Sequence, residues 1–237
     1  MIHILTGDAL GEQFPKNLAG QRIIARECLI DGPVHVPTLQ EFYDQRAHFL
    51  ATTYKACTPE EYATGSKGEF EKIRQLPPKA EIHLWFEDDL FCQVNAWFVC
   101  SLLSQTPGRS SVYLVRPDTL SPYGFGAYTP AQLLDLYQNK TALSPEDWAP
   151  LWTAYAAGDH QALQYAADAL PSAFQFVHNA VTAYKSQPDL PLLTLKSIVK
   201  ELNTKSLGPV FQEFQKRLPI YGYGDLQVAR LLNEIET

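Results

Sequence analysis

The stretch Trp85-Phe86-Glu87-Asp88-Asp89-Leu90-Phe91-Cys92-Gln93 decides the fold, because it leads from a strand into a helix through three successive carboxylates. Residues 81–86 form a mainly apolar run, which is typical of a buried strand. Residues 90–104 are apolar nearly all round, and a helix without a polar face must be covered on most sides. The sequence therefore predicts a central helix that is entered through an acidic corner.

Apolar runs typical of strands alternate with amphipathic runs in the first half of the chain. We expect four strands, at residues 2–6, 22–30, 81–86 and 111–116. We expect the intervening helices at residues 9–16, at 38–56, and onward from a capping box at Thr58-Pro59-Glu60-Glu61. Such alternation favours a parallel sheet with helices on both faces. The predicted fold class is α/β, with a four-stranded, mainly parallel, doubly wound sheet of the flavodoxin-like or Rossmann-like type.

The composition changes after Pro117, where a loop rich in glycine and aromatic residues is followed by helical patterns without a further strand pattern. Helix starts are indicated at Thr129-Pro130, at Ser144 with a capping box, and at caps formed by Asp159 and Asp225. The run 221–224 predicts an aromatic turn before the last of these helices. We place a boundary near residue 120, with an α/β domain at 1–120 and an all-helical C-terminal region at 121–237 packed on it.

Charge and composition limit the classes of function. Of the 237 residues, 46% are hydrophobic and 19% are charged, which is ordinary for a compact globular protein. The 19 Lys and Arg are scattered and are outnumbered by 26 Asp and Glu, so bulk nucleic-acid binding is disfavoured. The longest apolar stretch, 90–103, is too short to span a bilayer, and no secretory leader is recognisable. We therefore expect a cytoplasmic protein without membrane association.

The cysteines form no metal-binding or redox motif. They are Cys28, Cys57, Cys92 and Cys100, without a CxxC pair and without a histidine at zinc-ligand spacing. Free, buried thiols are the expectation. A helix dipole would lower the pKa of Cys92 in the first helical turn, whereas its apolar neighbours would raise that pKa. We expect Cys92 to be buried for structural reasons.

The carboxyl ends of the expected strands carry the residues best placed to form a site. In open α/β sheets, ligands bind outside these ends, where the strand order reverses. If the strand order is 2-1-3-4, the first and third strands are neighbours, and Gly7-Asp8 faces the acids at 87–89. The residues expected to line this pocket are Gly7, Asp8, Arg26, Glu27, Asp31, Arg46, Trp85, Glu87, Asp88, Asp89 and Gln93.

Two interpretations of the acids stay open. The four acids Asp8, Glu87, Asp88 and Asp89 could bind a divalent cation, since hard cations take carboxylate oxygens, or could act as an acid–base pair. Alternatively, Asp8 and one residue of the triplet cap helices while the others are solvated. Arg26 and Arg46 could likewise clamp an anionic group or form ordinary pairs with carboxylates. No motif assigns a catalytic residue, and the cofactor stays unknown.

The corner and several shorter motifs resemble a bacterial family catalogued as domain of unknown function 1835. The similar segments are Ile2-His3-Ile4 with Gly7-Asp8, Arg26-Glu27, Gly32-Pro33-Val34, Arg46 with Phe49-Leu50, residues 85–93, and Tyr221-Gly222 with Gly224-Asp225-Leu226-Gln227. They span most of the chain, and the corner is the most specific. The family commonly has histidine at the position of Asp88, and residues 190–202 differ from its usual helix start. The resemblance implies a set of residues and no particular activity.

These features favour a small-ligand-binding or regulatory protein whose pocket lies over the strand ends. The alternative is a metal-dependent hydrolase that acts on a phosphate ester and uses the same acids as metal ligands. A third class is a protein-interaction adaptor that works through the helical region.

Overall fold

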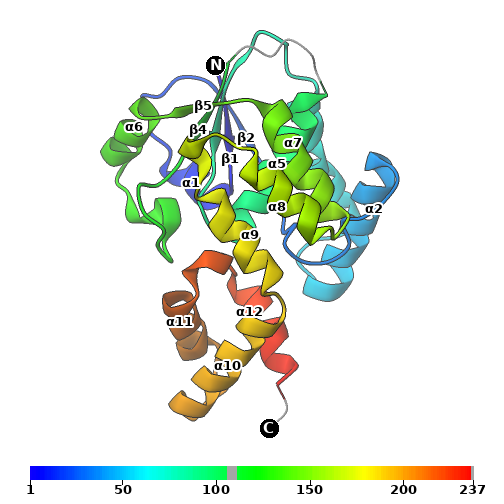
Figure 1. Cartoon of the computed structure of the whole chain (residues 1–237), viewed down its shortest axis with the longest axis vertical. Coiled ribbons are helices and arrows are strands. Elements are labelled where there is room, and N and C mark those ends of the chain that lie inside the picture. Colours follow the sequence, from blue (N-terminus) through cyan, green and yellow to red (C-terminus); the bar gives the residue numbers. More distant parts are fainter. Residues whose placement is uncertain (106–110, 236–237) are drawn as a thin grey trace.

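The computed structural model describes residues 1–105 and 111–235, and a sheet of five strands in the order β2-β1-β3-β4-β5 lies at its centre (Figure 1). The strands are β1 (Ile2–Leu5), β2 (Gln21–Ile24), β3 (Glu81–Trp85), β4 (Ser111–Val115) and β5 (Thr141–Leu143). The first four pair in parallel, whereas β5 runs antiparallel to β4. The α/β class and the mainly parallel sheet are confirmed, and the first four strands have the order 2-1-3-4 that the expected cleft requires.

Two predictions about the strands are wrong. The sheet has a fifth strand, β5, in a region where the sequence indicates helices. It has three residues, of which two are exposed, so it carries no strand pattern of its own. The strand expected at 22–30 ends at Ile24, after which the chain leaves the sheet and the side chain of Glu27 turns inward to pair with Arg46.

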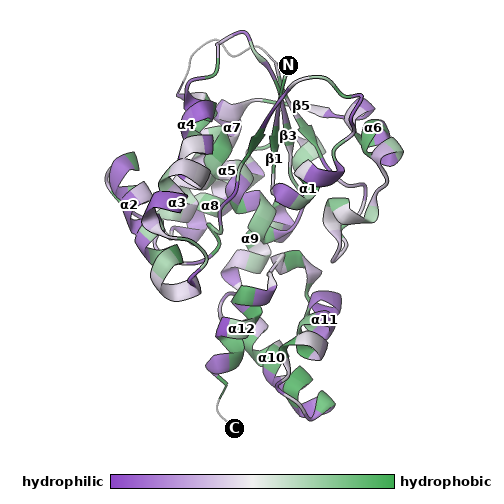
Figure 2. Ribbon diagram, turned by 180° about the vertical axis from the view of Figure 1, so that it is seen from behind, coloured by the Kyte–Doolittle hydropathy of each residue, from purple (hydrophilic) through white to green (hydrophobic). Residues whose placement is uncertain are grey.

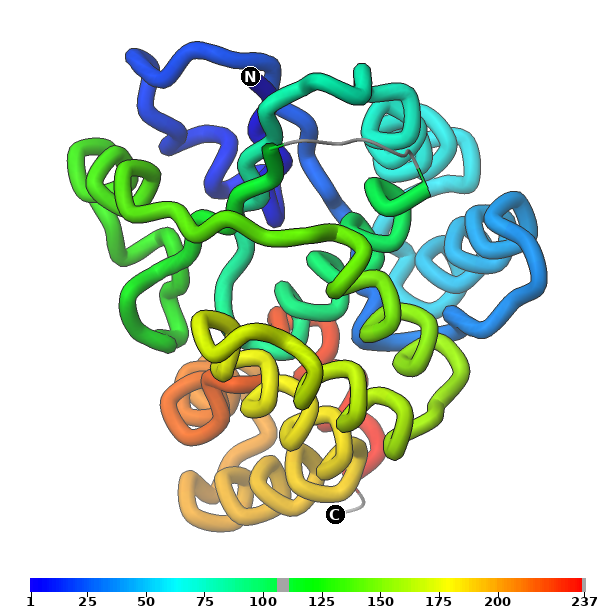
Figure 3. Tube along the Cα trace, turned by 45° about the horizontal axis from the view of Figure 1, so that its top comes forward, coloured from blue at the N-terminus to red at the C-terminus, as the bar shows by residue number. Residues whose placement is uncertain are grey.

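Helices surround this sheet, and Figure 3 traces their order along the chain. The first half contributes α1 (Asp8–Gln13), α2 (Leu39–Phe49), α3 (Pro59–Tyr62), α4 (Gly68–Arg74) and α5 (Leu90–Ser104), with π-helical turns at Leu50–Tyr54 and Ala63–Lys67. The second half contributes α6 (Pro130–Gln138), α7 (Pro145–Ala156), α8 (His160–Asp168), α9 (Val177–Lys185), α10 (Asp189–Leu202), α11 (Leu207–Arg217) and α12 (Asp225–Asn233). Short 3₁₀ turns lie at Gly124–Ala127, Ser172–Phe174 and Pro219–Tyr221. Within the described ranges, no helix combines the length and apolarity needed to cross a membrane.

Side chains alternate between the two faces of the sheet, and helices cover both faces. Ile4 and Leu84 belong to the larger core, which is built around α5. Leu5 and Trp85 belong to a smaller core on the other face, formed with α1 and α6. Figure 2 shows hydrophobic residues concentrated in the strands between these layers. The helix α5 is buried along almost its whole length, which confirms the predicted central helix.

The helices after β5 form two packing groups. Helices α7 and α9 pack on α5, α8 packs on α7, and all three share the larger core. Helices α10, α11 and α12 enclose a separate core that includes Leu195, Phe214 and Leu231, and we call residues 189–235 the C-terminal unit. Figure 1 shows this unit beyond the carboxyl ends of the strands, opposite the N-terminus. The division of the chain near residue 120 stays a prediction.

Most helix starts agree with the sequence. Thr58 and Thr129 form capping boxes, and the side chains of Asp89 and Asp159 accept hydrogen bonds from backbone N–H groups of their helices. Ser144 accepts a cap bond from the backbone N–H of residue 147, in place of the expected capping box.

The cap predicted at Asp225 is wrong, and Asp8 lies next to the cap of its helix, as expected, without capping it. Each acid is the first residue of its helix, and Gly7 and Gly224 occupy the cap positions before them. The Asp8 carboxylate does not reach back to the helix because it accepts hydrogen bonds from Arg26.

Candidate functional site

A pocket of about 260 Å³ opens over the carboxyl ends of β1 and β3, and the C-terminal unit forms its far wall. The chain passes from β1 to β2 on one side and returns to β3 on the other, so β1 and β3 flank the point where the strand order reverses. The lining residues are Thr6, Gly7, Glu87, Asp89, Phe91, Cys92, Ser121, Pro122, Tyr123, Phe214, Gln215, Leu218, Pro219, Gly222 and Tyr223. The pocket therefore lies where open α/β sheets hold their ligands.

The acidic corner positions three of these side chains. Extended backbone at Asp89 (φ −70°, ψ 160°) ends the loop after β3, and its carboxylate accepts a hydrogen bond from the backbone N–H of Cys92 at 2.9 Å. Asp89 is therefore the one residue of the triplet that caps a helix, as the second interpretation of the acids expected. This cap fixes Cys92 in the first turn of α5, while Glu87 stands at the end of the strand.

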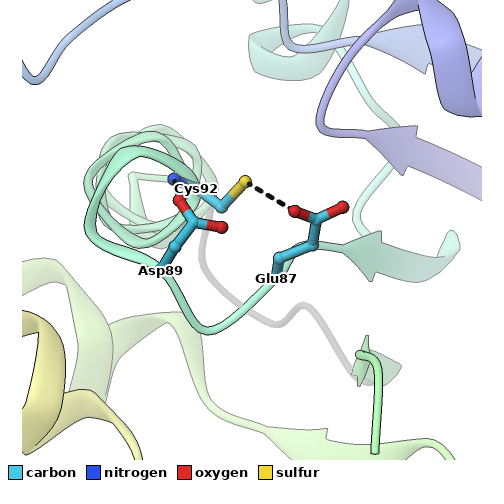
Figure 4. Close-up of side chains that lie close together, drawn as sticks. All are labelled: Glu87, Asp89 and Cys92. Atoms are coloured by element: carbon cyan, nitrogen blue, oxygen red, sulfur yellow. Dashed lines mark hydrogen bonds between the residues drawn. The ribbon is translucent and has the colours of Figure 1, made fainter. Parts of the chain in front are cut away.

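Glu87, Asp89 and Cys92 bring their polar atoms together at the pocket wall (Figure 4). One carboxylate oxygen from each acid and the Sγ of Cys92 all lie within 4.8 Å of one another. The thiol donates to Glu87 Oε2 at 3.7 Å and lies 3.2 Å from the Thr6 hydroxyl. Such a group of donors can share protons or bind a cation.

The two carboxyl groups have no cationic partner in the described part of the chain. Among the described residues, no lysine, arginine or histidine nitrogen lies within 4.0 Å of a carboxylate oxygen of Glu87 or Asp89. Burial and the charge of Glu87 raise the pKa of Asp89 to about 8. Burial, Asp89 and Glu87 also raise the pKa of the Cys92 thiol well above its usual value. At neutral pH, Asp89 and Cys92 therefore both keep a proton.

Two glycines allow the pocket walls to approach these acids. Gly222 has φ +62°, and a Cβ there would lie 2.0 Å from Asp89 Oδ1. Gly124 has φ +47°, and a Cβ there would lie 2.1 Å from the Glu87 carboxylate. Glu87 Oε1 also accepts a hydrogen bond from the backbone N–H of Phe125 at 2.7 Å. The walls are therefore seated directly against the acidic corner.

The other two acids that the sequence singled out pair with arginines. Asp8 pairs with Arg26 at the surface, where the hydrogen bond from Arg26 lowers the pKa of Asp8. Asp88 pairs with Arg116 beside the corner, although burial raises the pKa of Asp88. Neither acid lines the pocket, so of the four acids only Glu87 and Asp89 meet there.

Glu27 and Arg46 form a fully buried ion pair away from the pocket. Arg46 donates to both Glu27 oxygens, at 2.8 and 2.9 Å, and to the backbone oxygen of Cys28 at 2.8 Å. Tyr62 donates its hydroxyl to Glu27 Oε1 at 3.1 Å. This set of hydrogen bonds gives the pair a structural role beneath the loop after β2.

The remaining predicted residues are distributed around the corner. Gly7 lines the pocket, and Gln93 donates its side-chain amide to the backbone oxygen of Glu87 at 2.7 Å. Trp85 does not line the pocket. It faces the smaller core on the side of α1 and α6, and its indole N–H donates to His3. Asp31 lines a second pocket of about 300 Å³ and pairs with Arg230 of α12 at 2.9 Å.

Cys92, Thr6 and the C-terminal unit also line this pocket, although they were not among the predicted site residues. All four cysteines are free, as expected, and Cys92 is buried, but Cys28 and Cys57 are only half-buried. The expected turn at 221–224 is present, and its Gly222 and Tyr223 line the pocket. The glycines inside that aromatic run were the sequence signal for a close approach of backbone to another element.

No known family model, curated protein or solved structure matches this chain.

Proposed function

We propose that this chain is a small-ligand-binding or regulatory protein, with its ligand in the pocket over β1 and β3. The observation that carries the proposal is the pair of pocket-lining carboxyl groups, Glu87 and Asp89, without a cationic partner among the described residues. Convergent polar groups with perturbed pKa values in a concave site are typical of binding and active sites. Their position at the switch point of the sheet supports the same interpretation.

The residues that line the pocket indicate the size and the chemical groups of the ligand. Carboxyl oxygens of the corner can accept hydrogen bonds or bind positive charge, while Phe91, Tyr123 and Tyr223 offer aromatic surface around them. A volume of about 260 Å³ suits a compact metabolite better than a large cofactor. The ligand we expect is therefore small, with one polar group for the acids and one face for the rings.

The proposal extends to the fold and its setting. The strand order β2-β1-β3-β4-β5 is that of flavodoxin-like doubly wound sheets, apart from the antiparallel β5, and we assign the chain to that type. Four free cysteines favour a reducing compartment such as the cytoplasm. Membership of the family catalogued as domain of unknown function 1835 rests on the motifs around the corner and at 221–227.

A metal-dependent hydrolase that acts on a phosphate ester is the second candidate, favoured by the grouping of Glu87, Asp89 and Cys92. Asp8 and Asp88 are engaged by arginines and so contribute less than the sequence suggests. Two carboxylates repel a phosphate group unless a cation lies between them. This candidate therefore requires a metal at the corner, whereas ligand binding does not.

A pocket-filling variant tests the proposal. Gly7 lines the pocket, has extended backbone (φ −174°), and would carry a Cβ without a contact inside 4 Å. We expect Gly7→Leu to fold and to lose the ligands that wild type binds in a thermal-shift screen of amines, sugars, nucleosides and small acids.

Gly126→Leu is the matched control. A Cβ added at Gly126 would also meet no described atom within 4 Å, and Gly126 does not line the pocket. It should keep the ligand-induced rise in melting temperature. Equal ligand responses in wild type and Gly7→Leu would contradict binding at this pocket, as would a complete absence of ligand responses in wild type.

A further inference from the structure

The corner offers the donor set of a transition-metal site. Two carboxylate oxygens and one thiol sulfur lie within 4.8 Å of one another. Ligand atoms bound to one tetrahedral zinc ion at about 2.0 to 2.3 Å are roughly 3.5 Å apart, so side-chain rotation alone could close the set around an ion. Figure 4 shows the Cys92 sulfur and the Glu87 carboxylate facing each other, with one Asp89 oxygen directed to the same side.

Charge and burial point to a cationic occupant. The Asp89 side chain lines the pocket although the residue is only 4% exposed, and no positive group of the described residues compensates either acid. Buried carboxylates are normally paired with a cation or bound to a metal. Glu87 and Asp89 therefore offer the oxygen ligands that a cation in this pocket would need.

Gln93 lies beside the corner with an acceptor that lacks a partner. Its side chain is fully buried, and its Nε2 donates to the backbone oxygen of Glu87. Its Oε1 has no hydrogen-bond partner in the described part of the chain. A buried acceptor without a partner calls for an explanation, and a bound water or ion is one that fits its place next to Glu87.

On the basis of the proposed ligand pocket, we infer that Glu87, Asp89 and Cys92 hold one divalent transition-metal ion of the zinc type. Three protein ligands would leave a fourth position open toward the pocket, as in zinc sites that bind a substrate or water. The thiol selects zinc or cobalt over magnesium and calcium, which prefer a larger set of oxygen ligands. The pocket ligand would then contribute an oxygen or nitrogen atom to the ion.

Metal binding would displace protons from the corner. Before the ion binds, burial favours the protonated forms of Asp89 and Cys92. Binding requires a thiolate and a carboxylate, so Cys92 and Asp89 each release one proton to solvent. We therefore expect proton release on metal binding and weaker binding as the pH falls.

Cobalt binding tests the inference directly, with no organic ligand present. Titration of the metal-free protein with Co²⁺ should produce a thiolate-to-cobalt charge-transfer band in the near ultraviolet, and Zn²⁺ should abolish it by displacing cobalt. Cys92→Ser should lose the band, whereas Cys57→Ser, which changes a half-buried cysteine outside the site, should keep it. Asp89→Asn keeps a capping side chain and should weaken cobalt binding about tenfold or more.

Absence of the band in wild type, or its persistence in Cys92→Ser, would overturn the inference. Either result leaves the proposed ligand pocket intact if Gly7→Leu still abolishes ligand responses in the thermal-shift screen. Responses to primary amines without any cobalt band would show that a protonated amine, in place of a metal ion, neutralises the acids, and would also overturn the metal site.

Discussion

Asp89 is placed under two opposing demands. Its carboxylate caps α5, which favours the ionised form, yet it is buried beside Glu87, which favours the protonated form. The second demand is the stronger, since the pKa of Asp89 is raised to about 8. The buried acid therefore costs stability at pH values at which it is ionised in the unfolded chain.

The pH dependence of unfolding should reveal this cost. Because the folded-state pKa of Asp89 lies above the unfolded value of 3.8, the unfolded state loses the proton first, and stability from this group falls as the pH rises from about 4 to about 8. Asn caps helices as well as Asp does, so Asp89→Asn should be more stable than wild type at pH 8 by roughly 1 to 3 kcal/mol.

Urea denaturation in the presence of a chelator measures the difference at several pH values. Asp159→Asn, at an exposed cap of α8, controls for the exchange of a capping carboxyl for an amide. A stability difference between wild type and Asp89→Asn that stays constant from pH 4 to pH 8 would contradict the raised pKa.

The Glu27–Arg46 pair makes a second prediction at this scale. Both side chains are fully buried, so Arg46→Met leaves an uncompensated charge and should destabilise the protein by about 3 to 5 kcal/mol in urea denaturation. The double variant Glu27→Gln with Arg46→Met should recover much of this loss.

The exposed pair of Asp8 with Arg26 provides the control, and Asp8→Asn should change stability by no more than about 1 kcal/mol. Similar losses for Arg46→Met and Asp8→Asn would contradict the structural role of the buried pair.

At the scale of elements, the turn before α12 depends on the close approach of Gly222 to Asp89. An alanine there would overlap the carboxylate and would also strain the backbone at φ +62°. Gly158 has nearly the same backbone (φ +66°), but a Cβ added there would meet no described atom within 4 Å. Gly158→Ala therefore isolates the cost of the backbone strain, about 1 kcal/mol. We expect Gly222→Ala to cost roughly 1 to 3 kcal/mol more than Gly158→Ala in chemical denaturation. Equal losses of stability in the two variants would mean that the turn at Gly222 shifts away from Asp89 at no cost in free energy.

The elements that were predicted correctly are those whose own pattern of apolar residues determines their secondary structure. The central helix α5 and the strands β1 and β3 are apolar along their length, and burial requires that pattern. By contrast, β5 is a strand only because β4 offers it an edge, and two of its three residues are exposed. Asp8 fits the pattern of a cap, but Arg26, eighteen residues later, takes its carboxylate. A secondary structure or a hydrogen bond that depends on a residue far along the chain cannot be predicted from the local spacing of residues.

The site shows the same limit at the scale of the whole molecule. Once the order 2-1-3-4 is assumed, the strand ends place a pocket between β1 and β3, and Glu87, Asp89 and Gly7 were predicted among its lining residues. The far wall comes from residues 214–223, which local sequence cannot bring to the strand ends. The two halves of the pocket meet because the C-terminal unit, with its own core, is docked against the larger core.

Tyr221 is the residue through which we expect this docking to be controlled. It is fully buried in the larger core, bonds to Ser186, and immediately precedes the pocket residues Gly222 and Tyr223. Tyr221→Ala should cost about 3 to 5 kcal/mol and speed hydrogen exchange in α10–α12 more than in β1 and β3, because the separate core of the unit lets it detach without unfolding the sheet. Tyr221→Phe loses only the hydroxyl and should cost about 1 kcal/mol with little change in exchange. Uniformly faster exchange throughout Tyr221→Ala would instead mean that the two cores unfold together, and would contradict independent detachment of the C-terminal unit.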